Sequence, residues 1–184
     1  MKRRSREMVA LLPLALDRFK QEKIDFLAVT GDLLDVPSGM ACRSDYYDSP
    51  YGGWEARVRE DYRWIKQRLD ESLIPYAVLP GNHDMVGPFE EVFADQPAVI
   101  DLKQGFKIVK FHDREWAAHV PHRVDRERRR MEAVLEVESG SRQIHLQHYV
   151  IHPPCSGDYP YSYHEASDLL HTLVDSGSVL LALS

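Results

Sequence analysis

The sequence predicts an α/β fold whose central sheet is mainly parallel. Short apolar runs alternate along the chain with segments in which apolar residues recur at helical spacing. These runs are almost continuously apolar, as in strands that are covered on both faces. Because no internal repeat or domain linker interrupts the alternation, residues 1–184 are expected to form a single domain.

The chain begins with a predicted amphipathic helix over residues 5–22. Its apolar residues fit one helical face: Met8, Leu11, Leu12, Ala15 and Phe19. The alternative is a signal peptide, because basic residues precede the apolar stretch MVALLPLAL. We favour the helix, since Arg6 and Glu7 interrupt the approach to that stretch, Pro13 lies within it, and no clear small-residue cleavage site follows.

Strands and helices then alternate to the end of the chain. Buried strands are predicted at Phe26–Thr30 and Tyr76–Leu79, and a helix that starts near Trp54 lies between them. The later elements are strands at 99–102 and 106–111, a helix over 124–138, a strand at 143–150, a helix over 166–174 and a strand at 179–184. Two polar loops, at 36–54 and 153–163, are too long for plain connectors, which indicates a functional role.

The composition argues against several classes of function. A net charge of −6 disfavours a general nucleic-acid-binding protein, whose surface would be basic. No apolar run is long enough to span a membrane. Cys42 and Cys155 form no spaced pair, so neither a disulfide framework nor a zinc knuckle is indicated. A reducing compartment is therefore expected, and we predict a cytoplasmic protein. The sequence leaves the oligomeric state open.

Candidate ligand side chains follow three of the predicted strands. They are Asp32 and Asp35 in GDLLD, Asn82, His83 and Asp84 in GNHD, and His148 and His152 in QHYVIHPP. The carboxyl ends of parallel strands meet at one edge of a sheet, where the ligands of such folds bind. Glycines before Asp32 and Asn82 allow the backbone to turn sharply at the strand ends. We therefore expect Asp32, Asn82 and His148 to lie close together.

Carboxylate, amide and imidazole groups together form a mixed set of oxygen and nitrogen donors. This set suits Mn²⁺, iron or Zn²⁺ better than Ca²⁺. A carboxylate can bridge two cations, and cations ~3.5–4 Å apart can orient a phosphate ester, generate hydroxide and stabilise the leaving oxygen. Each motif alone also fits a structural role: GDLLD a capped turn, GNHD a polar turn, and His148 a hydrogen-bonded core histidine. Their occurrence at three strand ends in order favours the metal site.

VTGDLLD and LPGNHD, followed by a later strand-end histidine, resemble the calcineurin-like metallophosphoesterase superfamily. The motifs of that family run D-x-H, G-D-x-x-D, G-N-H-[DE], H and G-H-x-H, and the resemblance covers residue 24 to the end of the chain. It implies a layered α/β/β/α sandwich and a dinuclear centre of two divalent metal ions. It also implies that metal-bound hydroxide hydrolyses phosphoric esters.

The resemblance further implies a role for each matching residue. Asp32 would bridge the two metal ions, while Asn82 and His148 would bind the second one. His83 would be the general acid near the leaving group, and Asp84 would orient it.

Two nearby residues are less directly implied. Asp35 would stabilise the loop rather than bind a metal ion. His152, just before a double proline, is the rival of His148, and we favour His148 because it lies at the end of the predicted strand.

Two motifs of the family, D-x-H and G-H-x-H, do not occur in the sequence. In the family, the first motif precedes the first helix, and the second follows a strand like VLLALS. We therefore expect a sandwich that is incomplete at both termini, with exposed apolar faces and unpaired strand edges. One metal ion would lose most of its ligands, so these 184 residues alone are expected to show little hydrolysis.

The predicted function is thus metal-dependent hydrolysis of phosphoric monoesters or diesters. The alternative is a degenerate, non-catalytic metal-binding or scaffold domain of the same fold. A hydrolase with a single zinc ion would need a compact histidine-rich motif. The stretch HLQH at 145–148 does not supply one, because residues i and i+3 of a strand face opposite sides.

The substrate is expected to be a small phosphate ester that the sequence does not identify. The two long loops are the candidates for selecting it, because they are rich in tyrosine and aspartate. Their aromatic residues either stack on a base or sugar or pack within the loops: Tyr46, Tyr47, Tyr51, Tyr159, Tyr161 and Tyr163.

Overall fold

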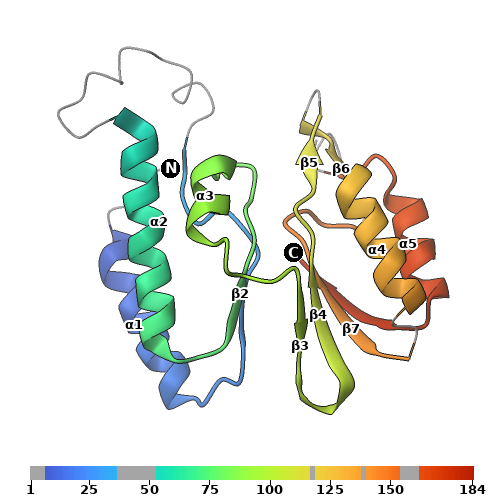
Figure 1. The fold of residues 1–184 in the computed structure, drawn as a ribbon, viewed down its shortest axis with the longest axis horizontal. Coiled ribbons are helices and arrows are strands. Elements are labelled where there is room, and N and C mark those ends of the chain that lie inside the picture. Colours follow the sequence, from blue (N-terminus) through green and yellow to red (C-terminus); the bar gives the residue numbers. More distant parts are fainter. Residues whose placement is uncertain (1–6, 37–52, 117–118, 138–139, 154–161) are drawn as a thin grey trace. The chain divides into compact units, whose positions relative to one another are not determined.

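The computed structural model describes residues 7–36, 53–116, 119–137, 140–153 and 162–184 (Figure 1). The chain divides into two compact units, Met1–Gln96 (unit 1) and Pro97–Ser184 (unit 2).

Unit 1 consists of helices and a short parallel sheet. Its elements are α1 (Met8–Gln21), β1 (Leu27–Val29), α2 (Gly53–Ser72), β2 (Tyr76–Val78) and α3 (Val86–Val92). Strands β1 and β2 pair in parallel, with Leu27 opposite Tyr76 and Val29 opposite Val78. Parallel strands cannot be joined by a hairpin, and α2 lies in the connection between these two.

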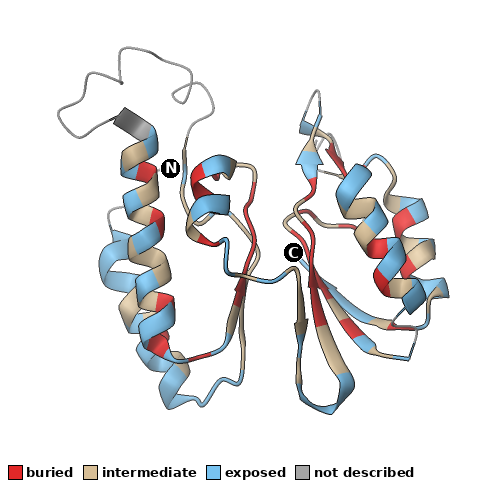
Figure 2. Cartoon of the chain, in the orientation of Figure 1, coloured by how far each residue is buried: buried red, intermediate tan, exposed pale blue. Residues whose placement is uncertain are grey.

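The core of unit 1 joins all three helices to the sheet. Its buried residues are Leu16 of α1, Val58, Tyr62 and Leu69 of α2, Val78 of β2, Phe89 of α3, and Phe93. The rings of Tyr62, Phe89 and Phe93 contact one another, and the Tyr62 and Phe89 centroids are 5.6 Å apart in an edge-to-face arrangement. Figure 2 shows the buried positions along the inner side of α2.

Unit 2 contains a four-stranded mixed sheet and two longer helices. Its elements are β3 (Val99–Asp101), a short 3₁₀ turn (Lys103–Gly105), β4 (Phe106–Lys110), β5 (Arg114–Glu115), β6 (Pro121–His122), α4 (Asp125–Val137), β7 (Arg142–Leu146), α5 (Ala166–Asp175) and β8 (Val179–Leu183). The strand order is β3-β4-β7-β8, and β4, β7 and β8 run parallel. Strand β3 pairs antiparallel with β4 through a tight turn, and β5 and β6 form a separate small hairpin.

Helices α4 and α5 lie beside the sheet of unit 2 (Figure 1), and their apolar side chains pack with those of the sheet. The buried cluster includes Val109 of β4, Met131 and Val134 of α4, and Leu169 and Leu173 of α5. The apolar residues of each helix recur at three- and four-residue spacing, so that one face packs on the sheet and the other meets solvent.

An ion pair is buried beside this apolar cluster. The side chains of Asp113 and Arg123 are both 0% exposed, and the guanidinium group donates to both carboxylate oxygens at 3.0 and 2.7 Å. Tyr163 also donates to Asp113, and the guanidinium lies 3.9 Å from the Phe111 ring centroid. Burial by itself would lower the pKa of Arg123, but the Asp113 carboxylate raises it, so the guanidinium stays charged.

The mixed α/β fold with mainly parallel strands is confirmed, and most elements lie where the sequence predicts them. The predicted strand at 143–150 is too long, because β7 ends at Leu146. Helix α3 and the hairpin β5–β6 were not predicted. They are short, and β5 and β6 have only two residues each, too few to show a period.

Apolar side chains are exposed on the first helix and on the last strand. Val9 and Leu14 of α1 are 63% and 64% exposed, and Leu180 and Leu181 of β8 are 58% and 47% exposed. Strand β8 is also an edge strand, because β7 is its one partner among the described strands. Exposed apolar faces and unpaired strand edges were expected from the sequence. Both features favour association between protein molecules.

Among the described residues, no helix combines the length and the apolar character that crossing a membrane requires.

His145 is a core residue of unit 2 rather than a ligand candidate. It lies in β7, is 0% exposed, and contacts the Phe111 ring at a centroid distance of 4.9 Å. Its Nε2 is 2.9 Å from the side-chain oxygen of Gln143, and its Nδ1 has no hydrogen-bond partner in the described part of the chain. Burial, together with the positive charge of Arg123, lowers the pKa of His145 to about 3.

The low pKa of His145 predicts a specific loss of stability in acid. Between about pH 6.5 and pH 3 the unfolded chain binds a proton at this site and the folded chain does not. The free energy of unfolding should therefore fall with decreasing pH, by up to ~1.4 kcal/mol per pH unit from this residue. Urea unfolding at several pH values between 6.5 and 4.5 measures this effect. The free energy of unfolding should fall less steeply with decreasing pH for His145→Gln than for the wild type.

The matched control is His171→Gln, which changes an exposed histidine of α5. This variant should keep the wild-type slope. Equal slopes for His145→Gln and the wild type would contradict the assignment of a buried neutral imidazole.

Candidate functional site

Two loops of unit 1 leave the same edge of its sheet. Because β1 and β2 are parallel with Val29 opposite Val78, residues 30–36 and 79–85 follow the strands on one side. The strand pairing extends one step further, since the Leu79 amide donates to the Val29 carbonyl at 3.1 Å. The two loops are also joined at their far ends, because the Val36 amide donates to the His83 carbonyl at 3.0 Å. The motifs GDLLD and GNHD therefore lie side by side.

Asp32 stands at the turn where β1 ends. The backbone is in the left-handed region at both Gly31 (φ 112°) and Asp32 (φ 54°). Glycine adopts this conformation without cost, and aspartate tolerates it better than most residues. One carboxylate oxygen of Asp32 accepts the His83 amide at 3.1 Å, and the residue is exposed. The strained turn thus presents a carboxylate beside GNHD, as is common at functional sites.

His83 is held by Asp35 from the neighbouring loop. Its Nδ1 is 2.7 Å from a carboxylate oxygen of Asp35, and the two side chains are 40% and 32% exposed. With a proton on Nδ1, the imidazole donates to Asp35, which leaves Nε2 as the nitrogen that can exchange a proton.

The implied role of Asp84 as the residue that orients His83 requires correction. The contact with the His83 ring belongs to Asp35. Asp84 is 8% exposed, and its carboxylate accepts the backbone amides of Leu33, Leu34 and Gly81 at 3.1, 3.0 and 2.9 Å. Backbone amides that are shielded from water need a hydrogen-bond acceptor. The Asp84 carboxylate is that acceptor for these three amides of the two loops.

Tyr62 completes the environment of Asp84. Its hydroxyl donates to Asp84 at 2.9 Å and accepts the Met85 amide at 3.0 Å. Burial raises the pKa of Asp84, and the hydrogen bonds from Gly81 and Leu34 oppose that shift. Burial and the adjacent Asp84 carboxylate raise the pKa of Tyr62, so this hydroxyl stays a donor.

Asn82 and His148 complete the predicted site residues. Asn82 lies in the turn between Gly81 and His83 and is half-buried. His148 lies in unit 2, two residues beyond the end of β7, and is also half-buried. Its ring meets the Tyr149 ring edge to face, with centroids 4.9 Å apart. The rival residue, His152, is exposed.

The donor chemistry of unit 1 suits a divalent cation. Asp32 offers carboxylate oxygens and Asn82 an amide oxygen, which are hard donors, and both sit on turns that follow neighbouring strands. In the part of the chain that the structure describes, however, no group of three or more His, Cys, Asp or Glu side chains is arranged to hold a metal ion. The donors of unit 1 are thus suitable in kind but incomplete by themselves.

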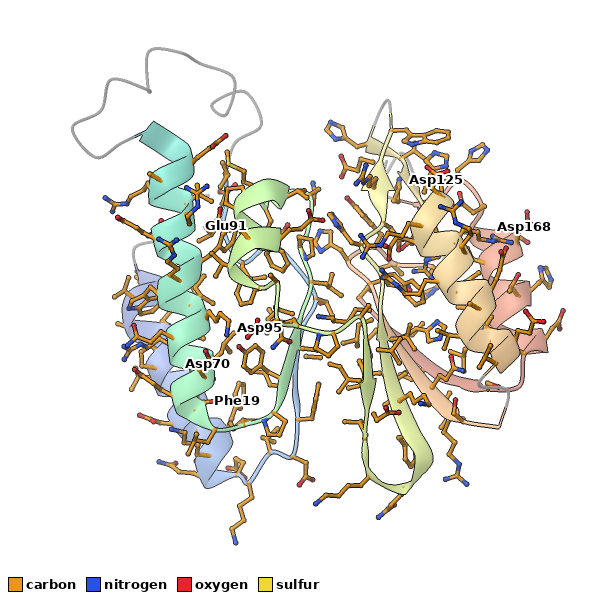
Figure 3. All side chains as sticks on the ribbon, viewed as in Figure 1. Phe19, Asp70, Glu91, Asp95, Asp125 and Asp168 are labelled. Atoms are coloured by element: carbon orange, nitrogen blue, oxygen red, sulfur yellow. The ribbon has the colours of Figure 1, made fainter. Side chains whose placement is uncertain are left out.

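A surface pocket of about 380 Å³ lies elsewhere on unit 1. It is lined by Arg63, Lys66, Gln67, Asp70, Glu71, Glu91 and Val92, and none of these is a predicted site residue. Lys66 forms ion pairs with Asp70 at 2.9 Å and Asp95 at 3.0 Å. Figure 3 labels Asp70, Asp95 and Glu91 in this region. The charged groups already pair with one another, so the pocket offers no unmatched charge that indicates a ligand.

Several predictions fall outside the described residues. These are Cys42, Cys155 and the loop tyrosines Tyr46, Tyr47, Tyr51, Tyr159 and Tyr161. Tyr163 is described and is 4% exposed, with its hydroxyl bonded to Asp113. It therefore packs in the core of unit 2 and is not a stacking surface for a substrate.

Solved structures share this fold at low sequence identity. The protein TT1561 of Thermus thermophilus matches with a TM-score of 0.63 and 16% identity, over 95% of this chain and 75% of that one. A dimetal phosphatase from Danio rerio matches with a TM-score of 0.63 and 16% identity, over 96% of this chain and 71% of that one. No curated protein sequence matches the chain.

A sequence model of the family described as calcineurin-like phosphoesterase matches residues 7–181. This match covers both units and includes GDLLD, GNHD and the histidine after β7. The chain therefore belongs to the calcineurin-like phosphoesterase family.

Proposed function

We propose that the protein is a metal-dependent hydrolase of phosphoric esters in which units 1 and 2 form one catalytic domain. The observation that carries the proposal is the joining of GDLLD and GNHD at one sheet edge, with His83 bonded to Asp35. Two further findings support it: the family match over residues 7–181, and the likeness in fold to a protein described as a dimetal phosphatase.

In this proposal Asp32, Asn82 and His148 bind divalent metal ions, with Asp32 as the bridging carboxylate. Such ions, when bound, activate water for attack and offset the negative charge of the phosphate. Mn²⁺, iron and Zn²⁺ are the candidates, because the donors are carboxylate, amide oxygen and imidazole.

His83 is the proposed general acid. Its role is to donate a proton from Nε2 to the oxygen of the departing alcohol. Asp35 fixes the ring through Nδ1 at 2.7 Å, which leaves Nε2 as the nitrogen that donates the proton. The buried Asp84 carboxylate fixes the loops 30–36 and 79–85 by accepting the amides of Leu33, Leu34 and Gly81.

We propose a small phosphomonoester or phosphodiester as substrate, without general nucleic-acid binding, because the net charge is −6. We propose a cytoplasmic location, because the two cysteines form no spaced pair.

The second candidate function is a non-catalytic metal-binding or scaffold domain of the same fold. The observation that favours its scaffold form is that, within the described ranges, no three His, Cys, Asp or Glu side chains form a metal-holding group. The hydrolase cleaves phosphate esters when its metal ions are bound. The non-catalytic domain cleaves none, whether or not a metal ion is bound.

Metal binding depends on Asp32 if the proposal is correct. Asp32→Ala should weaken Mn²⁺ binding by more than about 100-fold, beyond the range for residues that only support a ligand. Calorimetric titration of the metal-free protein with Mn²⁺ measures this. The control is Asp17→Ala, which removes an exposed carboxylate of α1 and should bind like the wild type. Equal affinities for Asp32→Ala and the wild type would rule out the assigned bridging role.

General-acid catalysis by His83 predicts a dependence on the leaving group. In the full-length protein loaded with Mn²⁺, His83→Ala should slow hydrolysis of an alkyl phosphate ester by ~10²–10⁴-fold. The loss should be much smaller for a bis-nitrophenyl phosphate, because nitrophenolate departs without protonation. His171→Ala, on the exposed side of α5, serves as control.

A loss that is the same for both substrates would contradict the general-acid role of His83. If the metal-loaded wild type hydrolyses no phosphate ester, the scaffold function replaces the proposed one.

A further inference from the structure

We propose that Tyr149, anchored by Glu115, is a positioning residue that sets the orientation of the His148 imidazole for metal binding. The inference rests on the proposed function, because it takes His148 as a metal ligand. Its new content is how unit 2 holds that ligand, which neither the family motifs nor the sequence pattern indicates.

His148 has no regular secondary structure to fix it. Strand β7 ends at Leu146, so His148 lies two residues beyond the strand. The last bonds of the strand are the Phe111 amide to the Leu146 carbonyl at 2.9 Å and the Gln147 amide to the Leu183 carbonyl at 3.0 Å. The position of a ligand just past a strand end must therefore come from its neighbours.

Both chain neighbours of His148 are buried, and each is anchored by a polar side chain. On one side, Arg123 donates to the side-chain oxygen of Gln147 at 2.9 Å, and Gln147 is 1% exposed. On the other side, the Tyr149 hydroxyl donates to a carboxylate oxygen of Glu115 at 3.0 Å, and Tyr149 is 5% exposed. Glu115 lies in β5 and Arg123 directly follows β6. The segment around this hairpin therefore bonds to the chain on either side of His148.

The rings transmit this anchoring to His148. The His148 imidazole meets the Tyr149 ring at 75° with centroids 4.9 Å apart, and Tyr149 meets Tyr163 at 85° with centroids 6.0 Å apart. Tyr163 is itself bonded to the buried Asp113. The ring beside His148 is therefore fixed at its hydroxyl by Glu115 and at its edge by a core tyrosine, which restricts the imidazole to few orientations.

Glu115 is suited to the role of anchor because it bonds two groups. Its second carboxylate oxygen is 2.9 Å from Nδ1 of His119, within the same hairpin region. Because the contact with His119 already restricts the carboxylate, Glu115 loses little further freedom when it accepts the Tyr149 hydroxyl.

The test compares metal binding with stability in variants that keep the rings. Tyr149→Phe removes the hydroxyl and retains the ring, so it should weaken Mn²⁺ binding by about 10-fold, the lower end of the effect of supporting residues. Glu115→Gln keeps an acceptor for the hydroxyl and should stay within about twofold of the wild type. The visible spectrum of the Co²⁺-loaded protein, which reports ligand geometry, should change in Tyr149→Phe and not in Glu115→Gln.

Tyr76→Phe is the matched control. It removes a tyrosine hydroxyl that donates to a carboxylate, Asp70, at 2.6 Å in unit 1. Both Tyr→Phe variants lose one such bond, so their melting temperatures should fall by similar amounts, while metal affinity should fall in Tyr149→Phe alone.

His148→Ala separates the two levels of the proposal. If His148→Ala binds Mn²⁺ as tightly as the wild type, or the wild type binds none, the ligand assignment of the proposed function is wrong. If His148→Ala weakens binding and Tyr149→Phe does not, the proposed function stands and the positioning role of Tyr149 is wrong.

Discussion

The carboxylate of Asp84 is the constraint on which the arrangement of unit 1 depends. It is buried and accepts four hydrogen bonds, three from backbone amides of two loops and one from Tyr62 on α2. The amides of Leu33 and Leu34 follow Asp32 directly, so the bonds fix the peptides that leave its left-handed turn. A strained backbone persists where its surroundings determine it so fully. The exposed carboxylate of Asp32 therefore owes its position to a buried one in the other loop.

The two units hold their polar groups in different ways. In unit 1 one carboxylate satisfies the backbone of two loops. In unit 2 the side chains of Asp113 and Arg123 satisfy each other, and the surplus donors of the guanidinium reach Gln147. Desolvating such a pair is costly, and it is tolerated here because two parallel bonds and further hydrogen bonds meet both charges.

Much of the fold follows from the sequence because its strands are apolar and its helices are periodic. Tyr76–Leu79 is an example: the run is apolar throughout, and β2 occupies Tyr76–Val78. The motifs GDLLD and GNHD could also be predicted to share a sheet edge, since parallel pairing requires it. Local pattern could not reveal the end of β7, because the residues after Leu146 remain as apolar and aromatic as those before it.

The roles of single polar residues were harder to predict. Asp84 and Arg123 are charged, and charge alone indicates a surface position. Their burial depends on partners far away in the sequence, such as Leu33 for Asp84 and Asp113 for Arg123. The role of Asp84 beside His83 was implied by the resemblance to the family, whereas in the structure Asp35 reaches the ring from the neighbouring loop.

The strand order of unit 2 has a consequence for the growing chain on the ribosome. Strand β7 lies between β4 and β8, and β8 leaves the ribosome after the whole of α5. During that interval β7 is paired on one side only, and its open edge is a template for a neighbouring nascent chain. In unit 1, strand β1 likewise waits for β2, which leaves the ribosome after the whole of α2. In unit 2 this exposure to misassembly therefore falls late in translation, in the part of the chain that contains His148.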